Sequence, residues 1–297
     1  MKDLLKNYKY RTREAALLDL LEGCVFFSKP SQFHANNDKL EGEFVMETTA
    51  STFMNAIIEA LNAIKITRGE PLNNSMKPSA SPTLSKLVTK ENENFIKQAN
   101  ELGIYSTSTT YDNQAMWSHY CKNEGLCFEF EWDQRIVEER HLIVSEVEYS
   151  DKLREINRDI IFKNMLIDYG NKHPELSINE VFNFSLSTEF RRKWMQEFII
   201  KCSCIKHVCW EYENEIRIIS PKAESFDILK KILKSVYMFI PQFKNPNFQE
   251  EIFKSRLLRM IWVQLADKYP DVKLFGLSYD KYGKLNKEGI VLNKYTI

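Results

Sequence analysis

The chain has 297 residues, of which 43% are hydrophobic and 28% charged, a composition typical of a soluble globular protein. Its 41 basic and 41 acidic side chains give a formal net charge of zero, so no global electrostatic attraction to nucleic acid or to an anionic membrane follows. No apolar run is long enough to span a bilayer, and no signal-peptide region opens the chain. The six unevenly spaced cysteines do not indicate a disulfide framework, which favours a cytoplasmic protein.

The first thirty residues are predicted to form a β-α-β unit. Residues 8–12 carry aromatic side chains at alternate positions, as in a strand. Thr12 is a suitable N-cap for a helix over residues 13–22, and Gly23 is a suitable end for it. The apolar residues 24–27 are predicted to be a second strand.

The remaining elements are predicted from apolar periodicity and turn residues. Helices are expected at 51–66, 86–102, 151–200, 225–238 and 246–267, and a loop at 67–85. Strands are expected at 104–109, 127–132, 143–149, 201–219 and 272–279, and a hairpin at 283–295. Because strands and helices are mostly segregated, we expect an α+β fold. We expect a single domain over residues 1–297, with a variable insert at about 39–95 and helical lobes at about 151–200 and 225–267.

The acidic segment Trp210-Glu211-Tyr212-Glu213-Asn214-Glu215-Ile216-Arg217 is predicted to be part of a strand. In a strand, Glu211, Glu213, Glu215 and Arg217 share one face, at a same-face spacing of roughly 7 Å. A row of carboxylates resists full ionisation, which raises pKa values, and such sites are often catalytic. The alternative is a solvated charged face of an edge strand.

Two further polar segments lie on other predicted strands. Arg11, beside Tyr10, ends the first strand, and Ser106 and Ser108 share one face of the strand at 104–109. An arginine binds phosphate or carboxylate through a planar fork. Together with the glutamates at 213 and 215, these residues could hold a phosphorylated ligand and stabilise a cationic sugar centre.

The segment from Asp112 to Gly125 contains a short aromatic helix with an expected cap at Asp112. Met116, Trp117 and Tyr120 make an apolar turn at helical spacing. His119 is interpreted either as a satisfied core histidine or as a donor to a ligand beside an aromatic wall.

The cysteine-rich segment contains Cys202, Cys204, His207 and Cys209. Thiolates and imidazoles bind zinc, but this is not a zinc-knuckle spacing. We therefore predict buried cysteines of a strand and no metal site. The sequence has no GxGxxG, no P-loop and no HExxH motif, so a Rossmann or Walker nucleotide site is not expected.

The chain resembles a bacterial family known as the domain of unknown function 2971 (DUF2971). The resemblance rests on Tyr10-Arg11, on Phe27-Ser28-x-Pro30, on the Met-Trp-x-His-Tyr piece within Ser108–Gly125, and on Lys-x-x-x-Trp-x-Tyr-Glu-x-Glu-x-Arg at Lys206–Arg217. It extends over nearly the whole chain.

A second, looser resemblance is to the arginine–serine–glutamate ADP-ribosyltransferases, whose Arg, Ser-Thr-Ser and Glu-x-Glu motifs follow one another in this order. It implies a split β-sheet core, NAD as the substrate, and a toxin or anti-phage defence effector. The acceptor would be protein, RNA or DNA, and an antitoxin or activating protein would be a possible partner. No membrane partner is implied.

This resemblance also implies roles for individual residues. Arg11, with Tyr10 beside it, would bind the phosphates or ribose of NAD, and Ser106 and Ser108 would support the nicotinamide ribose. Glu215 would be the catalytic glutamate, and Glu213 would orient or deprotonate the acceptor. The aromatic segment would complete the NAD site through Trp117, His119 and Tyr120, with Trp117 or Tyr120 stacking on nicotinamide.

Other functions stay open on the sequence alone. NAD glycohydrolase activity would use the same site with water as the acceptor. In a non-catalytic sensor or binding module of a defence system, Arg11, His119 and Glu215 would instead form a buried polar network. A metal-independent RNase using His119 and Glu215 is disfavoured, because no second suitably placed histidine is present.

Overall fold

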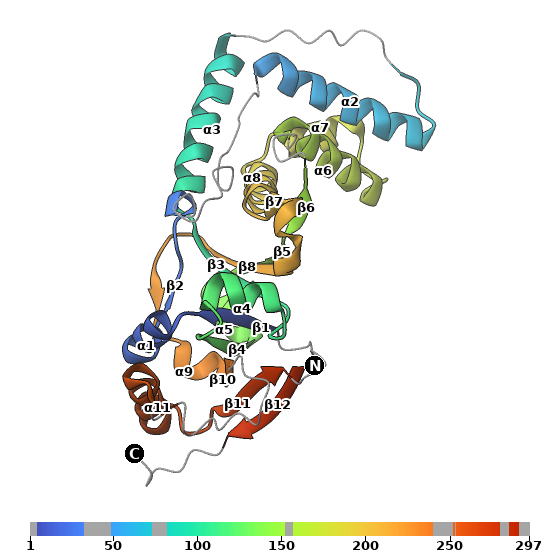
Figure 1. Ribbon diagram of the computed structural model, residues 1–297. Coiled ribbons are helices and arrows are strands. Elements are labelled where there is room, and N and C mark those ends of the chain that lie inside the picture. The colour runs from blue at the N-terminus through green and yellow to red at the C-terminus, as the bar shows by residue number, and fades with distance from the viewer. Residues whose placement is uncertain are drawn as a thin grey trace. The chain divides into compact units, whose positions relative to one another are not determined.

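The computed structural model describes residues 5–32, 49–72, 82–151, 157–239, 252, 254–279 and 285–290 (Figure 1). The chain forms two compact units: unit 1 comprises Met1–Lys29, Leu102–Tyr149 and Lys206–Ile297, and unit 2 comprises Pro30–Glu101 and Ser150–Ile205. The single domain over residues 1–297 stays a prediction. The α+β class is confirmed, since the large sheet is mixed and helices cover it.

The main feature of unit 1 is an eight-stranded sheet with the order β12-β11-β10-β4-β1-β3-β8-β5. Only β10 and β11 are parallel neighbours among its described strands, and the other pairs are antiparallel. The strands are β1 (Leu5–Arg11), β3 (Gly103–Ser108), β4 (Leu126–Trp132), β5 (Ile143–Glu146), β8 (Glu215–Ser220), β10 (Leu233–Phe239), β11 (Lys273–Tyr279) and β12 (Leu285–Ile290). Two small sheets pair β2 (Val25–Phe26) with β9 (Ser225–Phe226) and β6 (Glu148–Ser150) with β7 (Ile205–His207).

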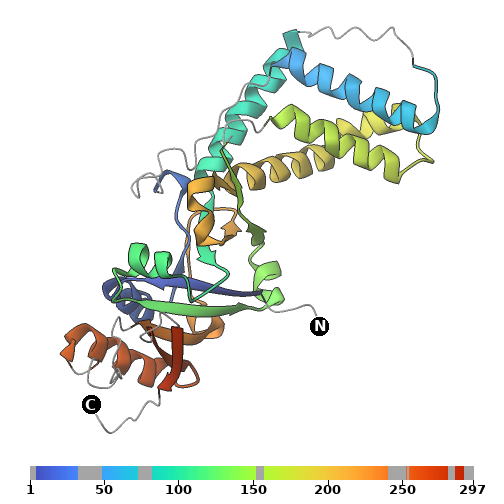
Figure 2. The same cartoon turned by 45° about the vertical axis from the view of Figure 1, so that its right-hand side comes forward.

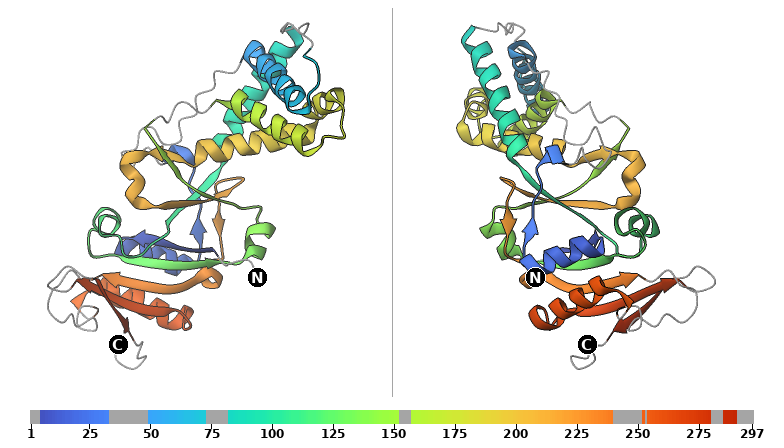
Figure 3. Two further views of the ribbon diagram at one scale, coloured as in Figure 1. Left: turned by 90° about the vertical axis from the view of Figure 1, so that its right-hand side faces the viewer. Right: turned by 60° about the vertical axis from the view of Figure 1, so that its left-hand side comes forward.

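The large sheet is held together weakly at its middle. Strand β1 pairs with β4 from Leu5 to Arg11, but it pairs with β3 only through Tyr8 and Ser108. Both views of Figure 3 show β3 running obliquely to β1. The sheet therefore consists of a larger part, β12-β11-β10-β4-β1, and a smaller part, β3-β8-β5, and the strand pairing between them is limited to one residue pair.

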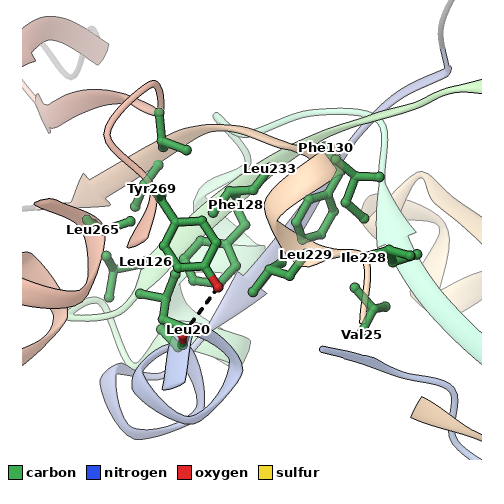
Figure 4. Close-up of a cluster of buried hydrophobic side chains, with 14 of the residues drawn as sticks. Leu20, Val25, Leu126, Phe128, Phe130, Ile228, Leu229, Leu233, Leu265 and Tyr269 are labelled. Atoms are coloured by element: carbon green, nitrogen blue, oxygen red, sulfur yellow. Dashed lines mark hydrogen bonds between the residues drawn. The ribbon is translucent and has the colours of Figure 1, made fainter. Parts of the chain in front are cut away.

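The main hydrophobic core lies on one face of the sheet, under α1 (Arg13–Glu22), α9 (Leu229–Ile232) and α11 (Arg256–Lys268). Alternate residues of β4, including Phe128 and Phe130, point into it because side chains of a strand alternate between faces. Figure 4 shows this cluster, in which the Tyr269 hydroxyl donates a hydrogen bond to the Leu20 carbonyl at 3.2 Å. This bond satisfies a polar group inside an apolar cluster.

The opposite face of the sheet carries a second, smaller cluster under α4 (Gln114–Cys121). Trp117 is fully buried there, and its ring packs edge-on against Tyr10 at 5.2 Å between centroids. The helix α5 (Gln134–Glu139) follows β4. Helix α4 contacts β1 and the segment Val208–Glu213, so it defines one wall of the site described below.

Unit 2 is helical and consists of α2 (Ala50–Arg68), α3 (Pro82–Glu101), α6 (Arg158–Lys172), α7 (Ile178–Ser185) and α8 (Thr188–Ser203) (Figure 2). Its core is aromatic: Phe53 stacks on Trp194 at 5.3 Å, and Phe162 packs edge-on against both rings. Among the described residues of the chain, no helix has the length and apolarity needed to cross a membrane.

Several local predictions are confirmed. Thr12 caps α1 by accepting a hydrogen bond from the Ala15 amide, and Gly23 ends α1 at a φ of +72°, where glycine is favoured. The strands at 104–109, 127–132 and 272–279 are present with small shifts at their ends. The predicted strand at 143–149 is instead two short strands, β5 of the large sheet and β6, which pairs with β7 in a separate sheet. In the predicted hairpin at 283–295, residues 285–290 form one strand, β12, which pairs antiparallel with β11. Residues 283–284 and 291–295 lie outside the described part, so the hairpin within this segment stays a prediction.

Two predicted segments are wrong. Residues 225–238 form β9, the four-residue α9 and most of β10, because the apolar residues of β10 are buried on both faces and show no strand alternation. In the predicted strand 201–219, α8 continues to Ser203, and a 3₁₀ helix, η2 (Val208–Glu213), follows β7. The predicted helix 246–267 is present as α11 from Arg256, and residues 246–251 lie outside the description.

Candidate functional site

The acidic segment is a turn of 3₁₀ helix followed by a strand, so the predicted strand over Trp210–Arg217 is wrong. Asn214 has a φ of +43° and its amide donates to the Glu211 carbonyl at 3.1 Å, which ends η2 and starts β8 at Glu215. Asparagine tolerates this left-handed conformation better than most residues. As a result Glu211 is exposed, Glu213 is buried at the end of η2, and only Glu215 and Arg217 share a strand face.

Four charged side chains form a buried network at this point. The Lys206 ammonium lies 2.7 Å from Glu213 Oε2 and 3.2 Å from Glu215 Oε2. Arg217 Nε lies 2.8 Å from Glu215 Oε1, and Nη2 lies 3.3 Å from Glu215 Oε2. Each of the four residues is at most 6% exposed. The network contains two positive and two negative charges, as buried charges require.

Hydroxyl groups from neighbouring elements complete the network. Tyr120 of α4 donates to Glu213 Oε1 at 2.6 Å, and Ser108 donates to the Glu213 carbonyl at 2.7 Å. The Tyr149 hydroxyl accepts a hydrogen bond from the Glu215 amide at 2.8 Å. The Ser106 side chain also bonds to the Glu215 carboxylate.

The surroundings raise the pKa values of Glu215, Lys206 and Tyr149, for different reasons. Burial raises the pKa of Glu215, although Lys206 and Ser106 oppose this. For Lys206, burial lowers the pKa, but Glu215 and Glu213 raise it more, so its net pKa is above the ordinary value. Burial, with a smaller contribution from Glu215, raises the pKa of Tyr149 to about 12 even though its bond with the Glu215 amide lowers it. A cationic Lys206 is therefore stable in this environment at neutral pH.

The sequence correctly predicted that the serine pair and the glutamates come together. In the register of β3 and β8, Ser108 lies opposite Glu215 and Ser106 lies opposite Arg217, all on the same face. Glu213 joins them from η2 through its contacts with Tyr120 and Ser108.

Arg11 and Tyr10 are placed differently. Arg11 pairs with Leu126 and lies on the sheet face that carries the main hydrophobic core. Its guanidinium bonds to Asp19 of α1 at 2.8 Å. Tyr10 points to the other face, the one that carries Glu215, but it is buried and its hydroxyl donates to the Thr110 carbonyl at 2.9 Å. The structure therefore does not bring Arg11 to the glutamates.

The aromatic segment is a helix, as predicted, but with different details. Asn113, not Asp112, caps α4 by accepting from the Ala115 and Met116 amides, and it also donates to the Tyr212 carbonyl of η2. His119 is exposed and its Nδ1 lies 3.1 Å from the Tyr212 hydroxyl, so its interpretation as a core histidine is wrong. Trp117 is fully buried, and Tyr120 reaches the site through its hydroxyl.

Sequence reasoning missed Lys206, Arg217 and Tyr149 as site residues. A signal existed for the first two, because they stand at the two ends of the Lys-x-x-x-Trp-x-Tyr-Glu-x-Glu-x-Arg pattern. Tyr149 had no signal, since it comes from β6 and contacts Glu215 only through tertiary structure.

The predicted strand position of Cys202, Cys204 and Cys209 is wrong. Cys202 lies in the last turn of α8, Cys204 follows it, and Cys209 is exposed in η2. All six cysteines are free thiols. Within the described residues, no group of three or more histidine, cysteine, aspartate or glutamate side chains could hold a metal ion.

The comparison with protein families finds one match in this region. Residues 116–218 match the family described as "Protein of unknown function (DUF2971)". Over these residues the chain is similar to that family, and the resemblance over nearly the whole chain that the sequence predicted is not shown beyond them. The matched segment contains most of α4, the first four residues of β8 and the whole Lys206–Arg217 pattern, so it includes the buried charge network but not Arg11, Ser106 or Ser108. No curated protein and no solved structure matches the chain significantly.

Proposed function

We propose that this protein is an NAD-dependent ADP-ribosyltransferase, acting as a toxin or anti-phage effector on a protein or nucleic acid. One observation carries the proposal. Glu215 lies beside the Ser106 hydroxyl on one sheet face, and Glu213 lies next to it through a shared lysine. The split between β1 and β3 agrees with the split sheet that the resemblance implies.

The residues have the chemistry that such a transfer needs. Glu215 would accept a hydrogen bond from a ribose hydroxyl and stabilise the positive charge that develops at C1′. The C1′–N bond to nicotinamide breaks and its electron pair leaves with nicotinamide. The acceptor nucleophile then bonds to C1′ and passes its proton to Glu213, which acts as the general base. Ser106 would position Glu215 through their hydrogen bond.

A second candidate is a non-catalytic binding module of a defence system. The hydrogen bonding of Glu215 favours it, because both carboxylate oxygens already bond to Lys206 or Arg217 and the residue is 5% exposed. A fully satisfied polar network can serve to specify a fold. This candidate predicts a stable protein that leaves NAD unchanged.

The test is incubation of the purified protein with labelled NAD and a cell lysate. Label on a macromolecule supports the transferase and identifies the acceptor class, and free ADP-ribose without labelled acceptor indicates NAD hydrolysis. Ser106→Ala is the diagnostic variant, since it removes one hydroxyl from Glu215 and no charge from the network. A drop in kcat at unchanged thermal stability supports a role for this site. If NAD stays intact at high protein concentration, the binding module is favoured.

A further inference from the structure

The Lys206 ammonium occupies the space between the two carboxylates that the proposed reaction uses. Its distances to Glu213 and Glu215 are 2.7 Å and 3.2 Å, and the Trp210 ring centroid lies 5.0 Å from it. Carboxylates and an aromatic ring are the groups that attract a cation. Lys206 therefore sits where a positively charged part of a ligand would be stabilised.

The charge balance shows why this matters for catalysis. Glu213 and Glu215 are already opposed by Lys206 and Arg217, so the four groups sum to zero. A cationic sugar centre approaching Glu215 would meet no net negative charge. The carboxylates can act on such a centre only after one of the two cations has moved away.

Lys206 is the cation that can move. Arg217 is 1% exposed and belongs to the six-residue β8, which has hydrogen-bonded neighbours on both sides. Lys206 belongs to the three-residue β7, whose only neighbour among the described strands is β6. Its flexible four-carbon stem permits withdrawal of the ammonium without rearrangement of the large sheet.

The chain order gives this contact a second significance. The chain passes from unit 1 into unit 2 after Tyr149 and returns to unit 1 at Lys206. Residues Ser150–Ile205 of unit 2 lie between these two positions in the sequence. Both residues contact Glu215. The Tyr149 hydroxyl accepts a hydrogen bond from the Glu215 amide, and the Lys206 ammonium donates one to the Glu215 carboxylate. The two ends of the inserted segment are therefore joined covalently to residues that hold Glu215.

We infer that Lys206 is an internal inhibitor whose ammonium must be displaced from Glu213 and Glu215 before a ligand with a positively charged ring, such as the nicotinamide of NAD, can use them. The inference rests on the proposed function for the role of Glu215. Its electrostatic part can be tested without any turnover.

The experiment compares Lys206→Met and Lys206→Gln with Lys206→Arg, which keeps the charge, and with Lys222→Met, a matched change at an exposed lysine. The Gln variant keeps a hydrogen-bond donor for the glutamates and serves if the Met variant does not fold, as judged by thermal unfolding. Calorimetry measures binding of 1-methylnicotinamide, a cationic pyridinium probe, and of neutral nicotinamide. NAD turnover is measured in parallel.

We expect the uncharged variants to bind the pyridinium at least tenfold more tightly than the wild type, with no such gain for nicotinamide, for Lys206→Arg or for Lys222→Met. A folded uncharged variant with unchanged pyridinium affinity overturns the inference, whatever its turnover. A tenfold gain without NAD turnover in any protein keeps the inference and counts against the transferase. A parallel rise in turnover supports both.

Discussion

Glu215→Gln tests the energetics of the buried network. The substitution keeps the shape of the side chain but removes the charge that faces Arg217 at 2.8 Å and Lys206 at 3.2 Å. Two unit charges about 3 Å apart interact by roughly 5 kcal/mol at an effective dielectric constant of about 20, and the relief of carboxylate desolvation offsets part of this. Removing one member of a buried ion pair costs about 3–5 kcal/mol. We expect Glu215→Gln to lower the free energy of unfolding by an amount of this size.

The assay is urea unfolding followed by tryptophan fluorescence, since four of the five tryptophans belong to unit 1. The free energy of unfolding is obtained from the midpoint at an unchanged slope. Glu224→Gln is the control, because Glu224 pairs with Lys222 at 3.4 Å at the surface, and such pairs contribute about 1 kcal/mol or less. A loss below about 1 kcal/mol for Glu215→Gln would refute the reasoning.

Three further predictions concern neighbouring groups. Tyr120→Phe removes the bond to Glu213 and should cost about 1–2 kcal/mol of unfolding free energy in the same urea assay. Burial lowers the pKa of Lys9 to about 7, so stability should fall as pH decreases from about 10 to 7, and Lys9→Met should flatten this dependence in thermal scans. Gly125→Ala would place a Cβ against the carbonyl oxygen of Arg11 and should lower the melting temperature by several degrees, whereas a change within one degree would contradict the predicted overlap.

The parts of the fold that depend on local signals could be predicted from the sequence. Helix α1 has its cap at Thr12 and its end at Gly23, and β11 has an apolar run of strand length. The conformation of the segment before Glu215 could not be predicted, because the aromatic and acidic residues of η2 alternate as they would in a strand. Only the left-handed Asn214 separates the two conformations, and that residue type alone does not specify it.

The site was predictable to the extent that it depends on strand order. Ser106, Ser108 and Glu215 meet because β3 and β8 are neighbours in register. The Lys206 contacts could not be derived from spacing, because they require the chain to return from α8 through β7 to the same sheet face. Ion pairing in this network is a tertiary property, whereas the serine pair follows from the period of a strand.

The placement of Arg11 bears on how far the ADP-ribosyltransferase resemblance extends. Neighbours in a strand point to opposite faces, so Tyr10 and Arg11 cannot both face Glu215. Register puts Tyr10 on that face and puts Arg11 beside Leu126 and Asp19. We therefore expect Arg11→Met to lower stability by about 1 kcal/mol through the lost Asp19 pair, and to leave the KM for NAD within about threefold.

The control is Asp19→Asn, which loosens the same contact but keeps the guanidinium of Arg11. A tenfold rise in KM for Arg11→Met, absent from Asp19→Asn, would mean that NAD reaches Arg11 through the separation between β1 and β3, where the Lys9 ammonium contacts the Ser106 carbonyl. The phosphate-binding role implied by the resemblance would then hold despite the opposite face. An unchanged KM in both variants would instead limit the resemblance to the serine pair and the glutamates, and the basic groups near the reacting centre would be Lys206 and Arg217.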